Sequence, residues 1–307
     1  MLLKNYPLIL DCDPGIDDVF AILLAHRKSE IDLKAICTVS GNVGIEMTTS
    51  NARLVAGLLG ADCIIAKGSS TPLIKDVQPI SDFHGKDGLG GYAHMFGSDR
   101  LLPLSDLNAL DTYRKILTES EEPVYIAAVG PLTNLAVLFL AYPELKSKIA
   151  AVSIMGGAIN MGNVTPFSEF NFFKDPEAAD IVMKSGVELL ICGLNVTQKA
   201  TLSENELQTL SRIHDEFTDF SMNILSTYVA EDTAIHDPCA ILALTDPDMF
   251  HYKDQYVEID TRVGITQGMS FVDAKRNPSE KPNCRVFYDM DTSFFRKSIL
   301  DALKMKG

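Results

Sequence analysis

Basic residues are scarce in this sequence relative to acidic ones. The 307 residues include 27 Lys and Arg against 41 Asp and Glu, so the formal net charge is −14. A nucleic-acid partner is not expected, because phosphate binding needs a basic surface. Hydrophobic residues at 46% and charged residues at 22% are typical of a globular protein, which excludes a disordered chain and predicts a large core.

The sequence also lacks paired cysteines and a long uninterrupted apolar stretch. None of its six cysteines forms a CxxC pair, and most lie in apolar runs, so we expect reduced, buried thiols. The most membrane-like segment, Val124–Tyr142, is broken by Gly130-Pro131, whereas a bilayer span needs about 20 unbroken apolar residues. No secretory signal is evident at the N-terminus, so we expect a cytoplasmic protein with no membrane partner.

What the sequence contains is a regular alternation of short apolar runs and helical patterns. Strands are expected at Leu8–Leu10, Leu33–Val39, Cys63–Ala66, Val124–Val129, Ala150–Met155, Leu189–Cys192, Tyr256–Ile259 and Arg285–Tyr288. Helices are expected at Val19–His26, Thr48–Leu59, Leu132–Ala141, Glu177–Lys184, Ser203–Val229 and Thr292–Met305. This order predicts an α/β fold of Rossmann-like type, with a mostly parallel central sheet flanked by helices. Because no linker or repeat interrupts it, we expect a single domain over residues 1–307.

The most informative segment is the aspartate-rich run Asp11-Cys-Asp-Pro-Gly-Ile-Asp-Asp. Asp11 and Asp13 end the first predicted strand and Asp17 and Asp18 open the next helix, at the edge of the sheet where ligands bind in such folds. Like charges this close would force protonation unless a cation is present, and hard oxygen ligands favour Ca²⁺ or Mg²⁺. The alternative is that Asp17 caps the helix while the others are solvated, but caps explain only one or two aspartates.

Two further polar segments come before residue 100. Ser40-Gly-Asn42 directly follows a predicted strand, although a plain turn would explain it as well. His84 begins the run His-Gly-Lys-Asp-Gly-Leu-Gly-Gly. This run lacks the preceding strand and the Lys-Ser/Thr ending of a phosphate-binding loop, so phosphate binding is only weakly indicated.

Polar residues gather again after Met155 and around residue 236. Asn163, Glu169 and Asn171 are spaced for several contacts to a polyhydroxylated ligand, because amides and carboxylates together supply donors and acceptors. A polar surface loop explains these three equally well. Asp237 could be a helix cap with proline following it, and the adjacent His236 could donate a proton near neutral pH.

With these segments in place, the sequence resembles the nucleoside hydrolase family, in its inosine–uridine preferring, pyrimidine-active type, over nearly the whole chain. The resemblance is carried by the aspartate run, Ser-Gly-Asn42, His84-Gly-Lys-Asp-Gly-Leu, Gly130-Pro-Leu-Thr-Asn, Met155-Gly-Gly, Glu169-Phe-Asn171, Asp175-Pro-Glu-Ala-Ala and His236-Asp-Pro. It implies hydrolysis of uridine, cytidine and/or inosine to ribose and a free base, for nucleoside salvage. The purine-specific branch of that family stacks the base on tryptophan, and this chain has none, so that branch is disfavoured.

The resemblance also implies a Ca²⁺ site and a ribose site. The residues implied as Ca²⁺ ligands are Asp13, Asp17, Asp18, Asp237 and the backbone carbonyl of Val129. The ribose diol and one water would complete the shell of ligands. Contacts to the ribose are implied for Asn42, Asn163, Glu169 and Asn171.

Catalytic roles follow from the same resemblance. Asp13 would accept the proton of the attacking water, His236 would protonate the leaving base, and His84 would lie near the base or the nucleophile. Asp11 would support the site from behind. Contacts to the base are expected from the loop near Pro72–His84 and the helix around Met222–Glu231, where Tyr228 would close over the base.

Two other functions fit parts of the sequence. A phosphatase of the haloacid dehalogenase type also places Asp-x-Asp after an early strand, but it expects Thr or Val where this chain has Gly15, and the Asp17-Asp18 pair is foreign to it. A nucleoside-binding protein without catalysis would have no use for the metal cluster or for His236. The family commonly forms dimers or tetramers, so we expect a homo-oligomer whose ligand is a small ribonucleoside.

Overall fold

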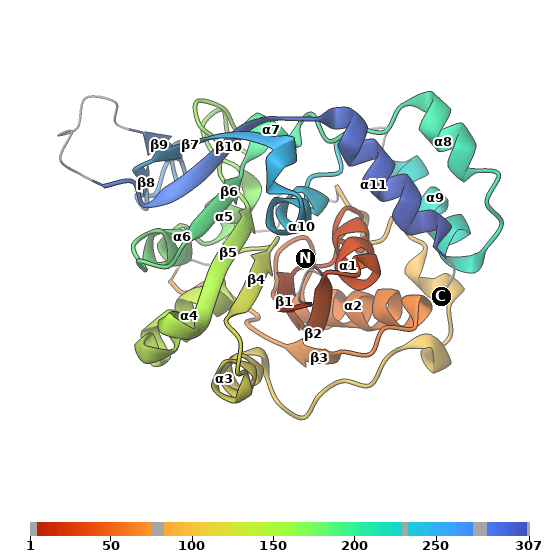
Figure 1. Ribbon diagram of the computed structural model, residues 1–307, viewed down its shortest axis with the longest axis horizontal. Coiled ribbons are helices and arrows are strands. Elements are labelled where there is room, and N and C mark those ends of the chain that lie inside the picture. Colours follow the sequence, from red (N-terminus) through yellow and green to blue (C-terminus); the bar gives the residue numbers. More distant parts are fainter. Residues whose placement is uncertain (1–4, 75–82, 229–232, 273–280, 306–307) are drawn as a thin grey trace.

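Apolar runs form the strands at the centre of the molecule (Figure 1). The computed structural model describes residues 5–74, 83–228, 233–272 and 281–305. In this part of the chain, eight strands form one sheet in the order β3-β2-β1-β4-β5-β6-β10-β7. Their bounds are β1 Tyr6–Cys12, β2 Ile31–Thr38, β3 Ile64–Lys67, β4 Val124–Ala128, β5 Ile149–Met155, β6 Leu189–Cys192, β7 Phe250–Gln255 and β10 Cys284–Met290. Every pairing in this sheet is parallel except that of β10 with β7, which confirms the predicted mostly parallel sheet.

Helices cover both faces of the sheet (Figure 1). One apolar core includes residues of α1 (Asp18–Arg27), α2 (Ile45–Leu59), α7 (Leu194–Thr197), α8 (Glu204–Leu210), α9 (Glu216–Tyr228), α10 (Pro238–Thr245) and α11 (Thr292–Lys304). A second core includes residues of α3 (Ala109–Glu119), α4 (Thr133–Ala141), α5 (Phe170–Lys174) and α6 (Pro176–Met183). Strand β1 contributes to both, because Leu8 and Leu10 face the first core and Ile9 faces the second. This is the single-domain α/β fold expected from the sequence.

The structure differs from the sequence prediction in three places. The expected single helix over Ser203–Val229 is two helices, α8 and α9, and Val229 lies outside the described residues. Asp215 lies between them, and its carboxylate accepts hydrogen bonds from the backbone N–H and the hydroxyl of Thr218. These two bonds mark the start of the second helix. Strand β8 (Val257–Ile259) confirms the strand expected at Tyr256–Ile259, and it pairs with β9 (Ser270–Val272) in a separate two-stranded antiparallel sheet. The edge strand β7, strand β9 and the helices α3, α5 and α7 are elements that the sequence interpretation did not delimit. Short 3₁₀ turns occur at Ala93–Met95, Ser98–Arg100, Pro143–Lys148 and Pro247–Met249.

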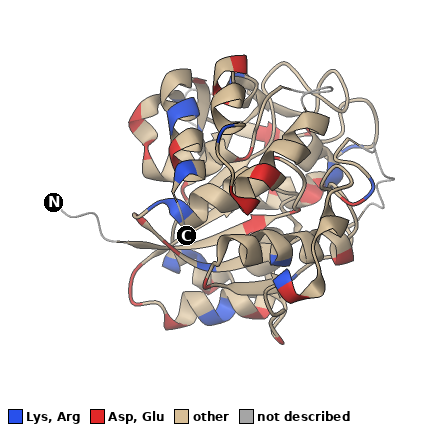
Figure 2. Cartoon of the chain, turned by 90° about the vertical axis from the view of Figure 1, so that its right-hand side faces the viewer, with Lys and Arg blue, Asp and Glu red and all other residues tan. Residues whose placement is uncertain are grey.

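Charges of both signs are interspersed over the helices in the view of Figure 2. All six cysteines are free thiols, and five of them are buried, as the sequence predicts. None of the helices in the described ranges has the length and apolar composition needed to cross a membrane.

Candidate active site

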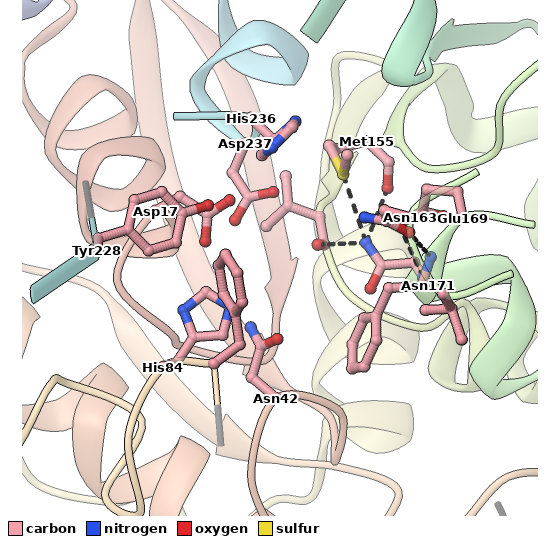
Figure 3. Close-up of a pocket in the computed structure, with 14 residues that line it drawn as sticks. Asp17, Asn42, His84, Met155, Asn163, Glu169, Asn171, Tyr228, His236 and Asp237 are labelled. Carbon is pink, nitrogen blue, oxygen red and sulfur yellow. Dashed lines mark hydrogen bonds between the residues drawn. The ribbon is translucent and has the colours of Figure 1, made fainter. Parts of the chain in front are cut away.

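A pocket of about 430 Å³ opens where β1, β2, β4 and β5 end (Figure 3). Asp17, Asn42 and Val129 follow β1, β2 and β4, and Met155 ends β5, so the parallel strands bring them to the same edge of the sheet. The pocket is also lined by the predicted residues His84, Asn163, Glu169, Asn171, Tyr228, His236 and Asp237. Asp13 and Asp18 are buried behind this lining. The structure therefore brings the predicted site residues together around one pocket.

Three carboxylates meet at one side of the pocket. Ligand oxygens of Asp17, Asp18 and Asp237 lie within 4.8 Å of one another, and all three residues are buried. Asp17 and Asp237 occupy the N-cap positions of α1 and α10, but neither side chain makes a capping hydrogen bond. The alternative that these two aspartates serve as helix caps is therefore wrong.

Burial, together with neighbouring charges, raises the pKa of two of these carboxylates, Asp18 and Asp237. Burial, together with the charge of Asp17, raises the pKa of Asp18 to about 8. Burial and the charges of Asp17, Asp18 and Asp13 raise the pKa of Asp237 well above its usual value. A divalent cation bound among them would reverse this preference, and a set of hard oxygen donors suits Ca²⁺ or Mg²⁺. The residues present thus fit a hard metal ion.

Asp13 lies next to this cluster, although it is not part of the group of three. Its Oδ2 accepts the backbone N–H of Asn42 at 2.6 Å, whereas its Oδ1 is buried with no hydrogen-bond partner. A Cβ on Gly41 would lie 2.0 Å from Oδ2, and a Cβ on Gly130 would lie 2.5 Å from Oδ1. Only glycine fits at either position, which explains why both the Ser-Gly-Asn and the Gly-Pro segments contain one.

Asn42 and Asn171 hold the strand ends that border the pocket. The side-chain amide of Asn42 donates to the carbonyl of Asp13 at 3.1 Å and to Asp18 at 3.3 Å. The amide of Asn171 donates to the carbonyls of Val129 at 2.8 Å and Met155 at 3.0 Å. Because both of its partners are acceptors, the nitrogen of Asn171 must face them. The carbonyl of Val129 keeps a second lone pair, so this bond does not prevent it from binding a cation.

Glu169 is held by the backbone at the start of α5. Its carboxylate accepts the N–H groups of Gly157 at 2.8 Å, Asn171 at 2.8 Å and Phe172 at 3.2 Å. Burial raises the pKa of Glu169 to about 6, and these bonds and the charge of His236 oppose the rise. Because Glu169 and Asn171 are buried, the surface-loop alternative is wrong for both. Asn163 is exposed, and its oxygen accepts the N–H of Phe170 at 3.0 Å.

His84 lies against the aspartate turn and two aromatic rings. Its Nδ1 accepts the backbone N–H of Ile16 at 3.1 Å, so this nitrogen carries no proton. The ring lies 5.5 Å from that of Tyr228, and Phe83 packs against both in edge-on geometry. A Cβ on Gly15 would come within 2.7 Å of His84 Nδ1, so the turn needs glycine there.

The glycine-rich run after His84 is closed by its own aspartate. Asp87 accepts the N–H groups of Leu89 at 3.0 Å, Gly91 at 2.8 Å and Ala93 at 3.1 Å. The amide of Asn51 joins the carbonyls of Asp87 and Pro14, which ties this run to the aspartate turn. Three N–H groups of this part of the chain are therefore already bonded to Asp87 and are not available to a phosphate.

Apolar side chains complete the pocket, and sequence reasoning missed most of them. Phe83, Val164 and Phe170 line it beside Met155. Phe83 and Phe170 each adjoin a predicted polar residue, and that adjacency was the only available signal. Parts of the two segments expected to contact the base, residues 75–82 and 229–231, lie outside the described residues.

Fold and site together define a class of enzyme. Buried carboxylates and a histidine converge on a pocket at the carboxyl ends of parallel strands, and these are the groups that cleave glycosidic bonds. The chain belongs to the family described as inosine-uridine preferring nucleoside hydrolase, whose sequence model matches residues 8–297. Nucleoside hydrolases act on N-glycosyl bonds, so the protein is an enzyme of that class.

Relatives and solved structures agree with this assignment. The chain is 38% identical to the pyrimidine-specific ribonucleoside hydrolase RihA of Escherichia coli strain SMS-3-5, over 97% of this chain and 98% of the relative. It resembles the structure of a purine-preferring ribonucleoside hydrolase from Gardnerella vaginalis, with a TM-score of 0.89, 29% identity and coverage of 97% and 98%. An inosine-guanosine nucleoside hydrolase matches with a TM-score of 0.91, 25% identity and coverage of 99% and 100%.

Proposed function

We propose that this protein is a Ca²⁺-dependent ribonucleoside hydrolase that converts uridine and cytidine, and/or inosine, to ribose and the free base in nucleoside salvage. The observation that carries the proposal is the buried group Asp17, Asp18 and Asp237 beside the partnerless Oδ1 of Asp13. The pyrimidine-specific relative and the lack of tryptophan support pyrimidine substrates.

The cation would be held by oxygen atoms alone. Asp13, Asp17, Asp18, Asp237 and the carbonyl of Val129 are the residues that would hold it. Bound there, Ca²⁺ would orient the ribose diol and a water and lower the pKa of that water.

The residues of the chain would then divide the reaction between them. Asp13 accepts a proton from the water while the oxygen of that water forms a bond to C1′ of the ribose. Asn42, Asn163, Glu169 and Asn171 hold the sugar hydroxyls, and the charge of Glu169 stabilises positive charge developing on the ring.

The leaving base is handled at the other end of the pocket. The electron pair of the C1′–N bond moves to the base, and His236 donates the proton that neutralises it. His84 and Tyr228, with Phe83 packed against them, would contact the base. Free ribose and a neutral nucleobase result.

The two rival functions are less consistent with the pocket. Among its described lining residues there is no Lys or Arg that could bind the phosphate group of an ester directly. A protein that only binds nucleosides would gain nothing from burying Asp18 and Asp237 beside Asp17, an arrangement that raises the pKa of both.

The test is release of reducing sugar from uridine, cytidine and inosine, before and after treatment with a chelator. We expect activity to disappear with the chelator and to return with added Ca²⁺. Added Ca²⁺ should not restore activity to Asp237→Asn, whereas the variant Asp301→Asn, at an exposed position, should behave as the wild type. Turnover that persists in the chelator would contradict the metal requirement. Phosphate release from nucleotides would favour the phosphatase, and binding of uridine without turnover would favour the binding protein.

We also propose that residues 1–307 form one catalytic domain that assembles into a dimer or tetramer in the cytoplasm. The support is the resemblance to a family that commonly forms such assemblies. Light scattering on the purified chain measures the assembly directly, and a monomeric mass would contradict it.

A further inference from the structure

His236 has one partner that the proposed mechanism does not use. The hydroxyl oxygen of Thr197 lies 2.8 Å from Nδ1 of His236, and both residues are buried. Thr197 is the last residue of α7, a short helix that follows strand β6. His236 itself lines the pocket beside Asp237 (Figure 3). The contact therefore joins helix α7, which follows strand β6 of the sheet, to a residue that lines the pocket.

The backbone already holds these two segments together without the hydroxyl. The carbonyl of Ala200 accepts the N–H of Ile235 at 2.8 Å, and Thr201 pairs with Ala234 in an antiparallel bridge. A hydroxyl is thus not needed to bring Thr197 close to His236. What it adds is a directed bond to one atom of the imidazole ring.

The choice of ring atom decides which nitrogen can serve the substrate. Since Nδ1 is engaged by Thr197, a proton delivered to a leaving base has to come from Nε2. A hydroxyl can donate to Nδ1 or accept from it, so the same bond persists before and after the proton has moved. A carboxylate in this place would instead hold the ring as a cation.

We propose that Thr197 is a positioning residue that fixes the ring of His236 with Nε2 directed at the leaving base. This inference rests on the proposed function, because it requires His236 to protonate that base. Thr197 is buried and is not among the residues that line the pocket, so it would act only through the histidine.

The test compares two substrates that differ in their need for the proton. The uracil of uridine leaves poorly without protonation, whereas the p-nitrophenolate of p-nitrophenyl riboside leaves as an anion. Thr197→Val keeps the shape and the backbone bonds but removes the hydroxyl. We expect kcat for uridine to fall by about 10- to 100-fold, the loss seen when the hydrogen-bond partner of a metal-binding histidine is removed. KM for uridine and turnover of p-nitrophenyl riboside should stay near the wild-type values.

Two further variants separate positioning from packing. Thr197→Ser restores the hydroxyl and should recover most of the uridine activity. Thr218→Val removes a buried threonine hydroxyl on α9 that donates to the carboxylate of Asp215, and it should leave kcat unchanged. Thr197→Ala carries the same expectation as Thr197→Val, so the test stands if the valine variant does not fold.

Three outcomes would overturn the proposal. They are an equal loss on both substrates in Thr197→Val, a Thr197→Ser variant as impaired as Thr197→Val, or full uridine activity without the hydroxyl. His236→Ala tests the underlying function separately, because it should slow uridine far more than p-nitrophenyl riboside. An equal loss in His236→Ala would remove the proposed role of His236 and that of Thr197 with it. If His236→Ala behaves as expected while Thr197→Val stays active, only the role of Thr197 fails.

Discussion

The two sides of the pocket are built in opposite ways. On the carboxylate side, Asp17, Asp18 and Asp237 crowd together, and Oδ1 of Asp13 is buried without a partner. On the capped side, the carboxylate of Glu169 is satisfied by backbone N–H groups, and the amide nitrogen of the neighbouring Asn171 is satisfied by backbone carbonyls. One side is electrostatically incomplete until a cation binds, whereas the other is rigid before any ligand arrives. Substitutions on the two sides should therefore fail in different ways.

The largest effect is expected from Asp13→Ala on the carboxylate side. Removal of the proposed general base should lower kcat for uridine by about 10²- to 10⁴-fold, because that is what positioned proton transfer contributes. The measurement is reducing sugar released at saturating uridine, with Asp301→Ala on the exposed face of α11 as control. Turnover within a factor of about ten of the wild type would exclude Asp13 as the base.

A smaller and pH-dependent effect is expected from Glu169→Gln on the capped side. Because burial raises the pKa of Glu169 to about 6, its carboxylate is ionised only above that pH, and kcat/KM should fall as the pH drops through about 6. The raised pKa also means that the free energy of unfolding decreases as the pH rises from the pKa of Glu169 in the unfolded chain toward 6. In Glu169→Gln, kcat/KM should no longer fall as the pH drops through about 6.

The same variant tests whether the two sides are independent. We expect Ca²⁺ to raise the melting temperature of the wild type, because a ligand that binds only the folded state stabilises it. Glu169→Gln should keep this rise, whereas Asp237→Asn should lose it. If Glu169→Gln also abolishes the Ca²⁺ effect, the division of the pocket into two sides is wrong.

The smallest effect on catalysis is expected from Asp87→Ala, in the run that follows His84. This run resembles the capped side, because Asp87 satisfies three backbone N–H groups. Loss of these three hydrogen bonds should lower the free energy of unfolding by about 1–3 kcal/mol. The drop in kcat should be much smaller than that of Asp13→Ala. Thermal denaturation and uridine turnover measure the two quantities. A loss of kcat as large as that of Asp13→Ala would place this run among the catalytic elements.

Much of the fold could be predicted because its parallel strands are covered on both faces. Runs such as the one in β4 are apolar throughout and are recognisable without alternation. Strand β7 has the sequence Phe-His-Tyr-Lys-Asp-Gln and is largely exposed at the edge of the sheet. It is stabilised by its pairing with β10, and this long-range contact cannot be recognised from the sequence of β7 alone. The break between α8 and α9 depends on the local bonds of Asp215, which competed with an otherwise helical sequence.

The site was predictable to the extent that its chemistry is concentrated in short segments. The carboxylate side comes mainly from one run of eight residues, so its composition alone indicates a cation. The bonds of Thr197 to His236 and of Ile16 to His84 join residues far apart in the chain, and only the folded structure reveals them. Phe83 and Phe170 could not be told from core aromatics, since a hydrophobic side chain carries no mark of which cavity it will line.

The two glycines around Asp13 leave the space that its carboxylate occupies, because a Cβ at Gly41 would come within 2.0 Å of Oδ2 and a Cβ at Gly130 within 2.5 Å of Oδ1. Oδ2 already accepts the N–H of Asn42, whereas Oδ1 is buried without a partner. A side chain added at either glycine would therefore press on the carboxylate proposed as the base. The placement of that base thus depends on two positions whose contribution is the absence of a side chain.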